Sequence, residues 1–427
     1  MPYKIAGIDV HKRMLAVVIS DVEIADQYEF ERRQFGSNPA QLRELAEWLL
    51  EQEVEEVVME STAQYWKPVW GALERYWKPL CQKPKGARPT SGSLHLAQAQ
   101  SNRAPHGRKK DFPDAERLVK RFVAHELRLS FVPDAEQRLW RTVMRRKYQM
   151  TCNRVQLHNR LEALLEEIHI KLSSFVSDLL GLSARRMLKA LADGESDPAA
   201  LAALADHRLR ATPEQLCDVL GACRELNPVY RRLVKMTLEE LELIESQIRQ
   251  LEQEMADLLH PHQKAVKQLV EVPGLGVDSA QQIIAEVGAA AAVFPSAGHL
   301  ASWVGACPGD DESAGVSYSH RSPKGNRHMR RILNQAAHAA VKLKGSIFQI
   351  LYRRYGPRLG HKQTIGIIAH RLCRLVWKIL HQDVSYRERG PDIALKSKRI
   401  RAARMIRELR SLGYRVEPEN SPSPARP

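Results

Sequence analysis

Short apolar runs near the N-terminus alternate with amphipathic segments, which is the pattern of an α/β domain. Residues 4–9 (KIAGID) and 14–20 (MLAVVIS) are β-rich runs separated by a polar turn, so they predict a β-hairpin. Helical periodicity over residues 39–52 predicts a helix, and residues 56–60 (EVVME) predict a buried strand. Residues 65–76 predict another helix.

The chain that follows this helix is less regular. Residues 79–112 are rich in Lys, Arg, Pro, Gly and Ser, which predicts a loop-rich segment. Pro113 suits the first turn of a helix, and the pattern after it predicts a helix to about residue 124.

Helical patterns dominate the middle of the chain. Residues 133–172 and 227–259 are strongly helical, and residues 182–226 between them predict a small helical insert. The apolar positions that recur at spacings of three and four are Leu238, Leu241, Ile244, Ile248 and Leu251. This repeat is typical of an antiparallel helix pair or a dimerising coiled coil, and its length of about three heptads leaves both an intramolecular hairpin and a dimer open.

These elements predict an α/β plus α protein in four parts. The parts are an N-terminal α/β domain (1–130), a central helical or coiled-coil oligomerisation region (131–263), a mainly helical C-terminal domain (264–385) and a basic tail (386–427). A length of 427 residues fits two or three domains. Apolar residues make up 44% of the chain, which excludes collagen, low complexity and disorder over most of the length.

Charge is distributed unevenly along the chain. Residues 301–427 contain 25 Lys and Arg against 9 Asp and Glu, a net charge of +16, whereas residues 1–300 contain 40 and 41, a net charge of −1. A neutral body with a strongly basic C-terminal third indicates a polyanionic partner, nucleic acid before membrane. The basic loop-rich segment at residues 79–112 is expected to face the same partner.

The compartment follows from what the sequence lacks. Six cysteines without a C-x-x-C pair argue against a disulfide framework or a zinc site. No apolar run reaches the ~18 residues that a membrane span needs. Asp9 and Lys12 lie where a signal peptide would need its apolar stretch. We expect a cytoplasmic protein, associated with the nucleoid if its partner is DNA, and no membrane contact.

Four carboxylates of the N-terminal domain are candidates for chemistry. Asp9 and Glu60 lie at the ends of predicted strands, and Asp111 and Asp114 lie three residues apart at the start of a predicted helix. Clustered carboxylates suit Mg²⁺ or Mn²⁺, and two such ions can clamp the attacking and leaving oxygens of a phosphodiester. The alternative is that they are solvated or helix-capping acids. The order strand-Asp, strand-Glu, helix-Asp indicates a ribonuclease-H-like metal-dependent nuclease fold.

A second motif lies at residues 270–288 (VEVPGLGVDSAQQIIAEVG). An apolar helix end, Pro-Gly-Leu-Gly and a second helix from about Val277 match a helix-hairpin-helix. Gly274 and Gly276 permit a tight turn whose backbone N–H groups can approach a phosphate. A plain helix turn is the alternative.

A third motif lies at residues 307–331 and combines hydroxyls with cations. Its serines are Ser313, Ser317 and Ser319, and its cations are Arg321, Lys324, Arg327, Arg330 and Arg331. A serine hydroxyl beside a cationic patch suits attack on a phosphodiester, although most such loops only bind phosphate. Spacing does not choose among the three serines.

Taken together, these motifs resemble the DEDD insertion-sequence transposases of the IS110 family, in its IS1111-like subgroup. The N-terminal motifs are GIDVHK (residues 7–12), MESTAQYW (59–66) and RKKDFPDAERL (108–118). The C-terminal motifs are VPGLG (272–276), FPSAGHLASWVGACPG (294–309), ESAG (312–315) and KGNRHMRRIL (324–333). The resemblance covers roughly residues 4–382 in the right order. His11, where many members carry a small residue, and the basic extension after about residue 386 are departures from the family pattern.

The resemblance implies a specific activity. Such recombinases have a RuvC-like catalytic domain whose carboxylates, here Asp9, Glu60, Asp111 and Asp114, bind Mg²⁺. Ser313, by its position in ESAG, would form a covalent phosphoserine link to DNA. The composite site would be assembled between subunits of a dimer or tetramer, with donor and target DNA selected by a structured bridge RNA.

Two other functions fit some of the same residues. A metal-dependent structure-selective nuclease, such as a Holliday-junction resolvase, needs the carboxylates but not the serine. A non-catalytic nucleic-acid-binding protein needs neither.

Overall fold

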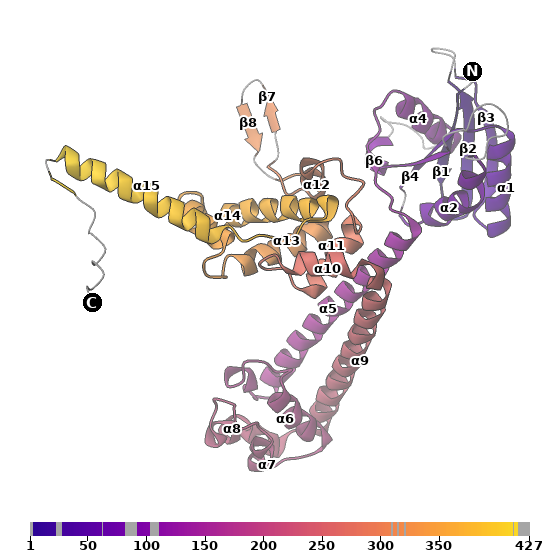
Figure 1. Cartoon of the computed structure of the whole chain (residues 1–427). Coiled ribbons are helices and arrows are strands. Elements are labelled where there is room, and N and C mark those ends of the chain that lie inside the picture. The colour runs from indigo at the N-terminus through magenta and orange to yellow at the C-terminus, as the bar shows by residue number, and fades with distance from the viewer. Residues whose placement is uncertain are drawn as a thin grey trace. The chain divides into compact units, whose positions relative to one another are not determined.

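The computed structural model describes residues 3–22, 28–61, 63–81, 92–102, 111–308, 311–313, 316–319, 322–412 and 414–416 (Figure 1). The chain divides into two compact units, Met1–Pro133 and Asp134–Pro427. Among the residues described, no helix is long and apolar enough to span a membrane.

The first unit is built on a six-stranded mixed sheet in the order β3-β2-β1-β4-β5-β6. Its strands are β1 (Lys4–Val10), β2 (Met14–Asp21), β3 (Glu31–Gly36), β4 (Glu56–Glu60), β5 (Ser93–Ala97) and β6 (Leu129–Ser130). The pairs β1/β2, β2/β3 and β5/β6 are antiparallel, and β1/β4 and β4/β5 are parallel.

Helices cover both faces of this sheet, because its central strands are apolar on both sides. On one face, Ala6 and Ile8 of β1 share a core with α1 (Pro39–Glu51) and α2 (Trp66–Ala72). On the other, Ile5 of β1 and Val58 of β4 share a core with α4 (Asp111–Val123). After α2 the chain continues as a π-helical turn (Leu73–Trp77) and α3 (Lys78–Cys81).

Helix α4 lies unusually close to β1 at Gly7. A Cβ at this position would lie 2.5 Å from the Ala115 carbonyl oxygen and 2.7 Å from Val119 Cγ2. Position 7 therefore has to be glycine for α4 to pack in this place.

The N-terminal predictions from the hydrophobic pattern are confirmed for the hairpin, the helix after residue 39 and the strand at residues 56–60. The prediction of a loop-rich segment at residues 79–112 is wrong over residues 93–97, which form β5 between β4 and β6. This run, SLHLA, is short and lies among residues typical of loops, so only its pairing with β4 identifies it as a strand. Residues 82–91 and 103–110 of that segment lie outside the described residues.

The second unit begins with two long helices, α5 (Ala135–Glu167) and α9 (Pro228–Leu258). Ion pairs join Lys147 to Glu252 and Arg154 to Glu245, so the helices run antiparallel. Leu238, Leu241 and Ile244 of the predicted repeat pack against α5 and the insert within one chain, which is the intramolecular hairpin among the two arrangements that the sequence left open. Formation of a dimer stays a prediction.

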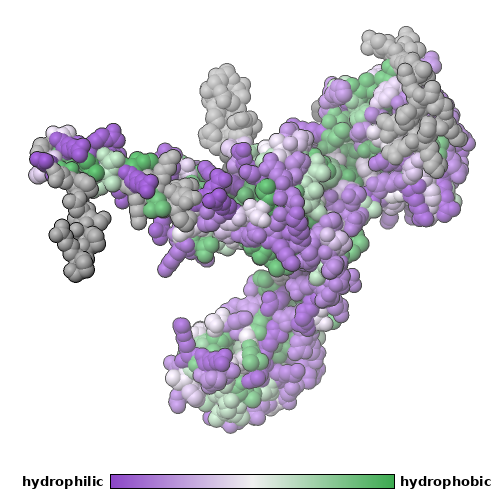
Figure 2. Space-filling view, viewed as in Figure 1, coloured by the Kyte–Doolittle hydropathy of each residue, from purple (hydrophilic) through white to green (hydrophobic). Residues whose placement is uncertain are grey.

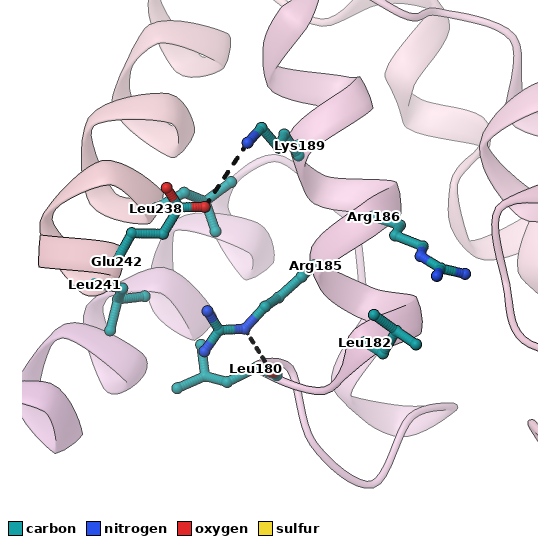
Figure 3. Close-up of a pocket in the computed structure, with 8 residues that line it drawn as sticks. All are labelled: Leu180, Leu182, Arg185, Arg186, Lys189, Leu238, Leu241 and Glu242. Carbon is teal, nitrogen blue, oxygen red and sulfur yellow. Dashed lines mark hydrogen bonds and ion pairs between the residues drawn. The ribbon is translucent and has the colours of Figure 1, made fainter. Parts of the chain in front are cut away.

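A helical insert lies between these two helices, as predicted. Its elements are η3 (Leu172–Ser174), α6 (Leu182–Asp193), α7 (Pro198–Ala203), α8 (Pro213–Val219) and η4 (Gly221–Glu225). A small pocket opens between α6 and α9, with Leu238 and Leu241 among its apolar lining (Figure 3). Two cations of its lining pair with acids of α9, Lys189 with Glu242 and Arg185 with Glu245, whereas Arg186 is exposed.

The remaining part of the second unit is mainly helical. Its elements are η5 (His260–His262), α10 (Gln263–Val270), α11 (Val277–Val287), α12 (Ala297–Val304), β7 (Asp311–Ser313), β8 (Val316–Ser319), α13 (Arg327–Ala340), α14 (Ile347–Gln382) and α15 (Gly390–Ser411). Helices α10, α11, α12, α13 and α14 share one core with Trp140 and Met144 of α5. Helix α14 is broken at Gly360, which has φ 78°. The coarse prediction, α/β followed by mainly α, is confirmed; the ribbon β7–β8 replaces the predicted serine-rich loop.

A buried carboxylate joins α5, α11 and α13 in this unit. Glu286 of α11 accepts hydrogen bonds of 2.9 Å from both Arg145 Nε and Arg145 Nη2, and one of 2.8 Å from Asn326 Nδ2. Burial alone would raise the pKa of Glu286, but the guanidinium groups of Arg145 and Arg141 hold it below its usual value. Asn326 in turn caps α13, because its Oδ1 accepts from the first backbone N–H groups of that helix. Glu286 thus fixes where α13 begins.

Gly7→Ala should loosen α4 from the sheet. The added methyl group meets backbone and Val119, so we expect a loss of about 1–3 kcal/mol in the free energy of unfolding, measured by denaturant titration. Gly71→Ala in α2 is the matched control, since a Cβ there has nothing within 4 Å and alanine is favoured in a helix. Equal stability of the two variants would contradict the close packing at Gly7.

Candidate active site

The two strand carboxylates lie side by side at one edge of the sheet. Strands β1 and β4 are parallel with Ile8 opposite Met59, so the next residues, Asp9 and Glu60, are neighbours. Because side chains alternate along a strand, both follow Ile5 and Val58 onto the face that α4 covers.

Helix α4 brings the other two carboxylates to this edge. Asp111 is its first residue and Asp114 lies in its first turn, where the positive end of the helix dipole favours negative charge. The close contact at Gly7 holds the helix against β1, two residues before Asp9.

The other three acids lie close enough to Asp9 to shift its pKa. Asp9 is 7% exposed, and burial, opposed by His11 and reinforced by repulsion from Glu60, Asp114 and Asp111, raises its pKa to about 6. An uncompensated negative potential of this kind is offset by a bound cation.

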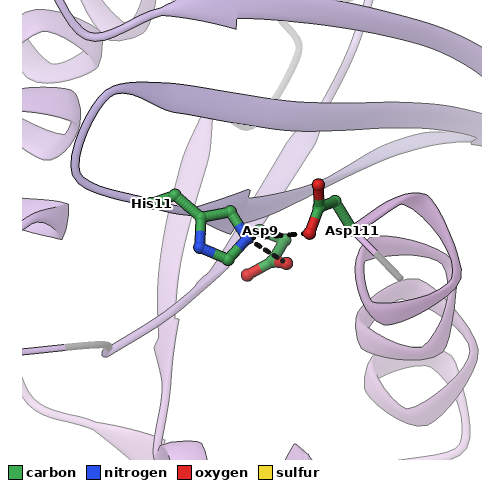
Figure 4. Close-up of side chains that lie close together, drawn as sticks. All are labelled: Asp9, His11 and Asp111. Carbon is green, nitrogen blue, oxygen red and sulfur yellow. Dashed lines mark hydrogen bonds and ion pairs between the residues drawn. The ribbon is translucent and has the colours of Figure 1, made fainter. Parts of the chain in front are cut away.

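His11 is the nearest partner of two of these acids. Its Nε2 lies 3.2 Å from Asp9 Oδ2 and 3.1 Å from Asp111 Oδ1 (Figure 4). The three ligand atoms all lie within 4.8 Å of one another. Adjacent ligands of an octahedral ion with bonds of ~2.1 Å are about 3.0 Å apart, so these spacings fit a shared divalent cation. In the sequence His11 stands out only as a departure from the family pattern, although its position two residues after Asp9 is a usable signal.

Two further residues orient the remaining acids. Asn102 Nδ2 donates to Glu60 Oε2 at 2.9 Å, and Arg117 Nη1 donates to Asp114 Oδ1 at 2.8 Å. Asn102 is 3% exposed, and its Oδ1 is a buried atom without a hydrogen-bond partner in the described part of the chain. Nothing in the sequence around Asn102 singled it out, because only the fold brings it to Glu60.

The candidate serines lie on the β7–β8 ribbon of the second unit. Ser313 pairs with Val316 at the turn, whereas Ser317 lies opposite Glu312 and Ser319 opposite Asp311. The backbone therefore distinguishes the three serines, with Ser313 nearest the tip; their side chains, and the whole of Arg321, lie outside the described residues.

The base of the ribbon is clamped by two glycines. A Cβ on Gly325 would lie 2.3 Å from the Val304 carbonyl carbon and oxygen, and one on Gly305, which has φ 71°, would lie 2.5 Å from the Pro323 carbonyl oxygen. The Asn326 N–H also donates to the Trp303 carbonyl oxygen at 3.1 Å. Both ends of the segment that carries the serines are thus fixed to one point of the helical body.

The predicted phosphate-binding cations from Lys324 onward lie at and after the base of the ribbon. Lys324 and Arg327 are exposed, and Arg330 donates to the Pro323 carbonyl oxygen at 3.2 Å. Arg331 is half-buried, with its guanidinium 4.1 Å from the Tyr148 ring centroid and bonded to Gln335 at 2.9 Å. Arg331 therefore has a packing role besides any contact with phosphate.

The predicted helix-hairpin-helix has the expected helices, α10 and α11, with α11 beginning at Val277. Gly274 has φ 88°, and a Cβ there would lie 2.3 Å from the Ala336 carbonyl oxygen, so this glycine is required by the packing against α13. The Gly276 N–H donates to Ser279 Oγ at 2.8 Å within the turn. Phosphate binding by either glycine stays a prediction.

Two family models and two relatives match this chain. A family model described as "Transposase", of the DEDD type found in IS110, matches residues 6–170, and one described as "Transposase IS116/IS110/IS902 family" matches residues 266–353. A relative from Streptomyces coelicolor, "Insertion element IS110 uncharacterized 43.6 kDa protein", is 24% identical over 67% of this chain and 74% of its own length. A protein from Sinorhizobium fredii, named provisionally as transposase y4pF/y4sB, is 25% identical over 41% of this chain and 46% of its own length.

Asp9→Asn should stabilise the protein at high pH when a chelator is present. The folded-state pKa of Asp9 is raised to about 6. The folded protein is therefore more stable when Asp9 is neutral, and this stability is lost as the pH rises through that value and Asp9 ionises. We expect equal melting temperatures near pH 4 and a higher one for the variant near pH 8, by roughly 2–4 °C per kcal/mol. Saturating Mg²⁺ should stabilise only the parent protein. Identical melting curves at pH 8 would contradict the crowded acidic site.

His11→Ala should weaken Mn²⁺ binding more than Mg²⁺ binding, since imidazole is a better ligand for Mn²⁺ than for Mg²⁺. Bound Mn²⁺ should show nitrogen coupling in pulsed electron paramagnetic resonance, and the variant should lose this coupling and about tenfold in affinity. His207→Ala, a change at an exposed histidine of the insert, serves as control. A parent protein that binds Mn²⁺ without nitrogen coupling would show that His11 only pairs with the acids.

Proposed function

The chain belongs to the IS110 family of insertion-sequence transposases, and on that premise we propose that it cuts and rejoins DNA with two sets of residues. It is a DNA transposase. The first set is the acidic site of Asp9, Glu60, Asp111 and Asp114, and the second is the nucleophile Ser313. The observation that carries the proposal is the in-register pairing of β1 and β4, which makes Asp9 and Glu60 neighbours.

We assign the first unit a ribonuclease-H-like, RuvC-like fold. The mixed sheet with an antiparallel β3-β2-β1 half and parallel β4 and β5 supports this assignment, as does the match to DEDD transposases. In this scheme the sheet positions two acids at strand ends and α4 supplies the other two.

The donor set of the acidic site fits a divalent ion, which we take to be Mg²⁺ or Mn²⁺. Such an ion, when bound, neutralises charge on the phosphate and on the attacking and leaving oxygens. The residues of this chain hold the site: Asn102 orients Glu60, Arg117 orients Asp114, and Asp9 and Asp111 face His11.

Ser313 is the proposed nucleophile. Its Oγ would attack the scissile phosphorus and lose its proton, while the displaced deoxyribose oxygen leaves with a proton, so that a phosphoserine ester stores the bond energy. A hydroxyl of the recipient strand then attacks this ester and releases the serine. The position of Ser313 at the turn of β7–β8, where it pairs with Val316, supports this choice over Ser317 and Ser319.

Three further features belong to the same proposal. The carboxylates and the serine lie in different units, so we propose that a dimer or tetramer completes the site. We propose a structured bridge RNA as the selector of donor and target DNA, because base pairing can deliver sequence choice to a protein that contacts mainly phosphates. We also propose that the protein acts in the cytoplasm, at the nucleoid.

Ser313→Ala should bind DNA like the parent protein but form no covalent adduct. The test uses a suicide DNA substrate whose nicked product traps the intermediate, followed by nuclease digestion and mass spectrometry of the linked peptide. Asp9→Asn should also abolish strand exchange, since the acidic site is then incomplete.

Ser317→Ala and Asp218→Asn are the matched controls, the first on the same ribbon and the second at an exposed acid of α8; both should retain adduct formation and strand exchange. A phosphoryl link at Ser317 would overturn the assignment of Ser313. Strand exchange without any adduct would leave the metal-dependent nuclease chemistry and remove the serine from the mechanism.

A further inference from the structure

Helix α14 lies in a stretch of the chain that contains no acidic residue. Between Ser313 and Gln382 the sequence has fourteen Lys and Arg and no Asp or Glu, and seven of these cations belong to α14. Among the residues that the structure describes, none of the seven takes part in an ion pair or side-chain hydrogen bond, and Arg354 lies over the Tyr355 ring. No acid in the described part of the chain therefore pairs with the cations of α14.

Three of these cations form a stripe on one side of the helix. Arg371, Arg374 and Lys378 follow at spacings of three and four and are exposed, and we call them the α14 stripe. The opposite side of the same turns, including Leu372 and Val376, is buried in the core of the second unit. Like charges at these spacings destabilise a helix, which indicates that the compensating anion comes from outside.

The helix segment that carries the stripe is fixed to the base of the serine ribbon. His370 Nδ1 lies 2.9 Å from the Ala306 carbonyl oxygen, one residue after the Gly305 clamp. Trp377 Nε1 donates to the Phe294 carbonyl oxygen at 2.8 Å. Both contacts come from residues adjacent to the stripe, so this part of α14 is fixed to the unit that also carries Ser313. Hydrophilic residues are prominent on the visible surface of this C-terminal part (Figure 2).

We propose that the α14 stripe is a binding site for a nucleic-acid phosphate backbone. Seven residues of helix span about 10.5 Å, which matches the axial rise of about three phosphates of one strand. An acidic protein surface would offer the same sign of charge without this regular spacing. The site is distinct from the cations at the start of α13, and it rests on the proposed function only in that the partner is nucleic acid.

The test compares two variants that each remove three positive charges. Arg371→Gln/Arg374→Gln/Lys378→Gln removes the stripe, and Arg186→Gln/Arg232→Gln/Arg249→Gln removes three exposed cations from α6 and α9. Affinity for a DNA duplex and, separately, for a structured RNA hairpin is measured against salt concentration in a chelator, so that no chemistry occurs. The stripe variant should bind at least tenfold more weakly near 0.15 M salt, with the salt-dependence slope on duplex DNA reduced by about 0.9 for each lost phosphate contact.

The two arms identify the source of the phosphates. A loss confined to DNA assigns the stripe to donor or target, and a loss confined to RNA assigns it to the guide. The variant Arg371→Lys/Arg374→Lys keeps the charge and should retain the parental salt-dependence slope. If the triple variant folds poorly, the single variant Arg374→Gln takes its place, and its slope should be smaller than the parental slope by about one unit.

Three results would overturn the assignment of the stripe. The first two are a parental salt-dependence slope in the stripe variant and an equal loss of affinity in the α6/α9 variant. The third is a stripe variant that still binds nucleic acid but no longer binds polyglutamate, which would identify an acidic protein as the partner. A parent protein that binds neither DNA nor RNA would instead contradict the proposed function itself.

Discussion

Helix α4 can lie on strand β1 only because residue 7 has no side chain, and the acidic site depends on that contact. The helix carries Asp111 and Asp114 on its first turn, and the strand carries Asp9 two residues beyond the contact. A larger residue at position 7 would separate the helix from the sheet and spread the carboxylates apart. The same closeness removes Asp9 from water, so the packing that assembles the site also makes its negative charge costly.

Acidic side chains are arranged differently in the two units. In the first, carboxylates are gathered at one sheet edge, and Asn102 and Arg117 satisfy only part of their capacity for hydrogen bonds. In the second, one acid, Glu286, is fully enclosed by Arg145, Arg141 and Asn326 and serves to fix α13. Beyond it the chain runs from Ser313 to Gln382 without an acid. One unit is thus suited to hold cations and the other to hold a polyanion, which are the two requirements of chemistry on DNA.

The sequence carried enough information to predict the acidic edge but not its surroundings. Strand ends and alternation place Asp9 and Glu60 together once β1 and β4 are taken as parallel neighbours, and the hydrophobic pattern supports that pairing. Strand β5 was missed because five residues among loop-forming ones have no periodicity of their own, and Asn102 was missed because its role exists only through contacts distant in sequence. The clamp of Gly305 and Gly325 was equally invisible, since two glycines twenty residues apart give no local signal.

The close packing of Gly305 and Gly325 separates the ribbon from the helices that support it. Because the two ends of the ribbon are fixed to each other and to the core, a change in the length or composition of the intervening segment need not disturb the helices below it. The ribbon is thus a unit that could be exchanged as one piece, provided that Gly305 and Gly325 are kept.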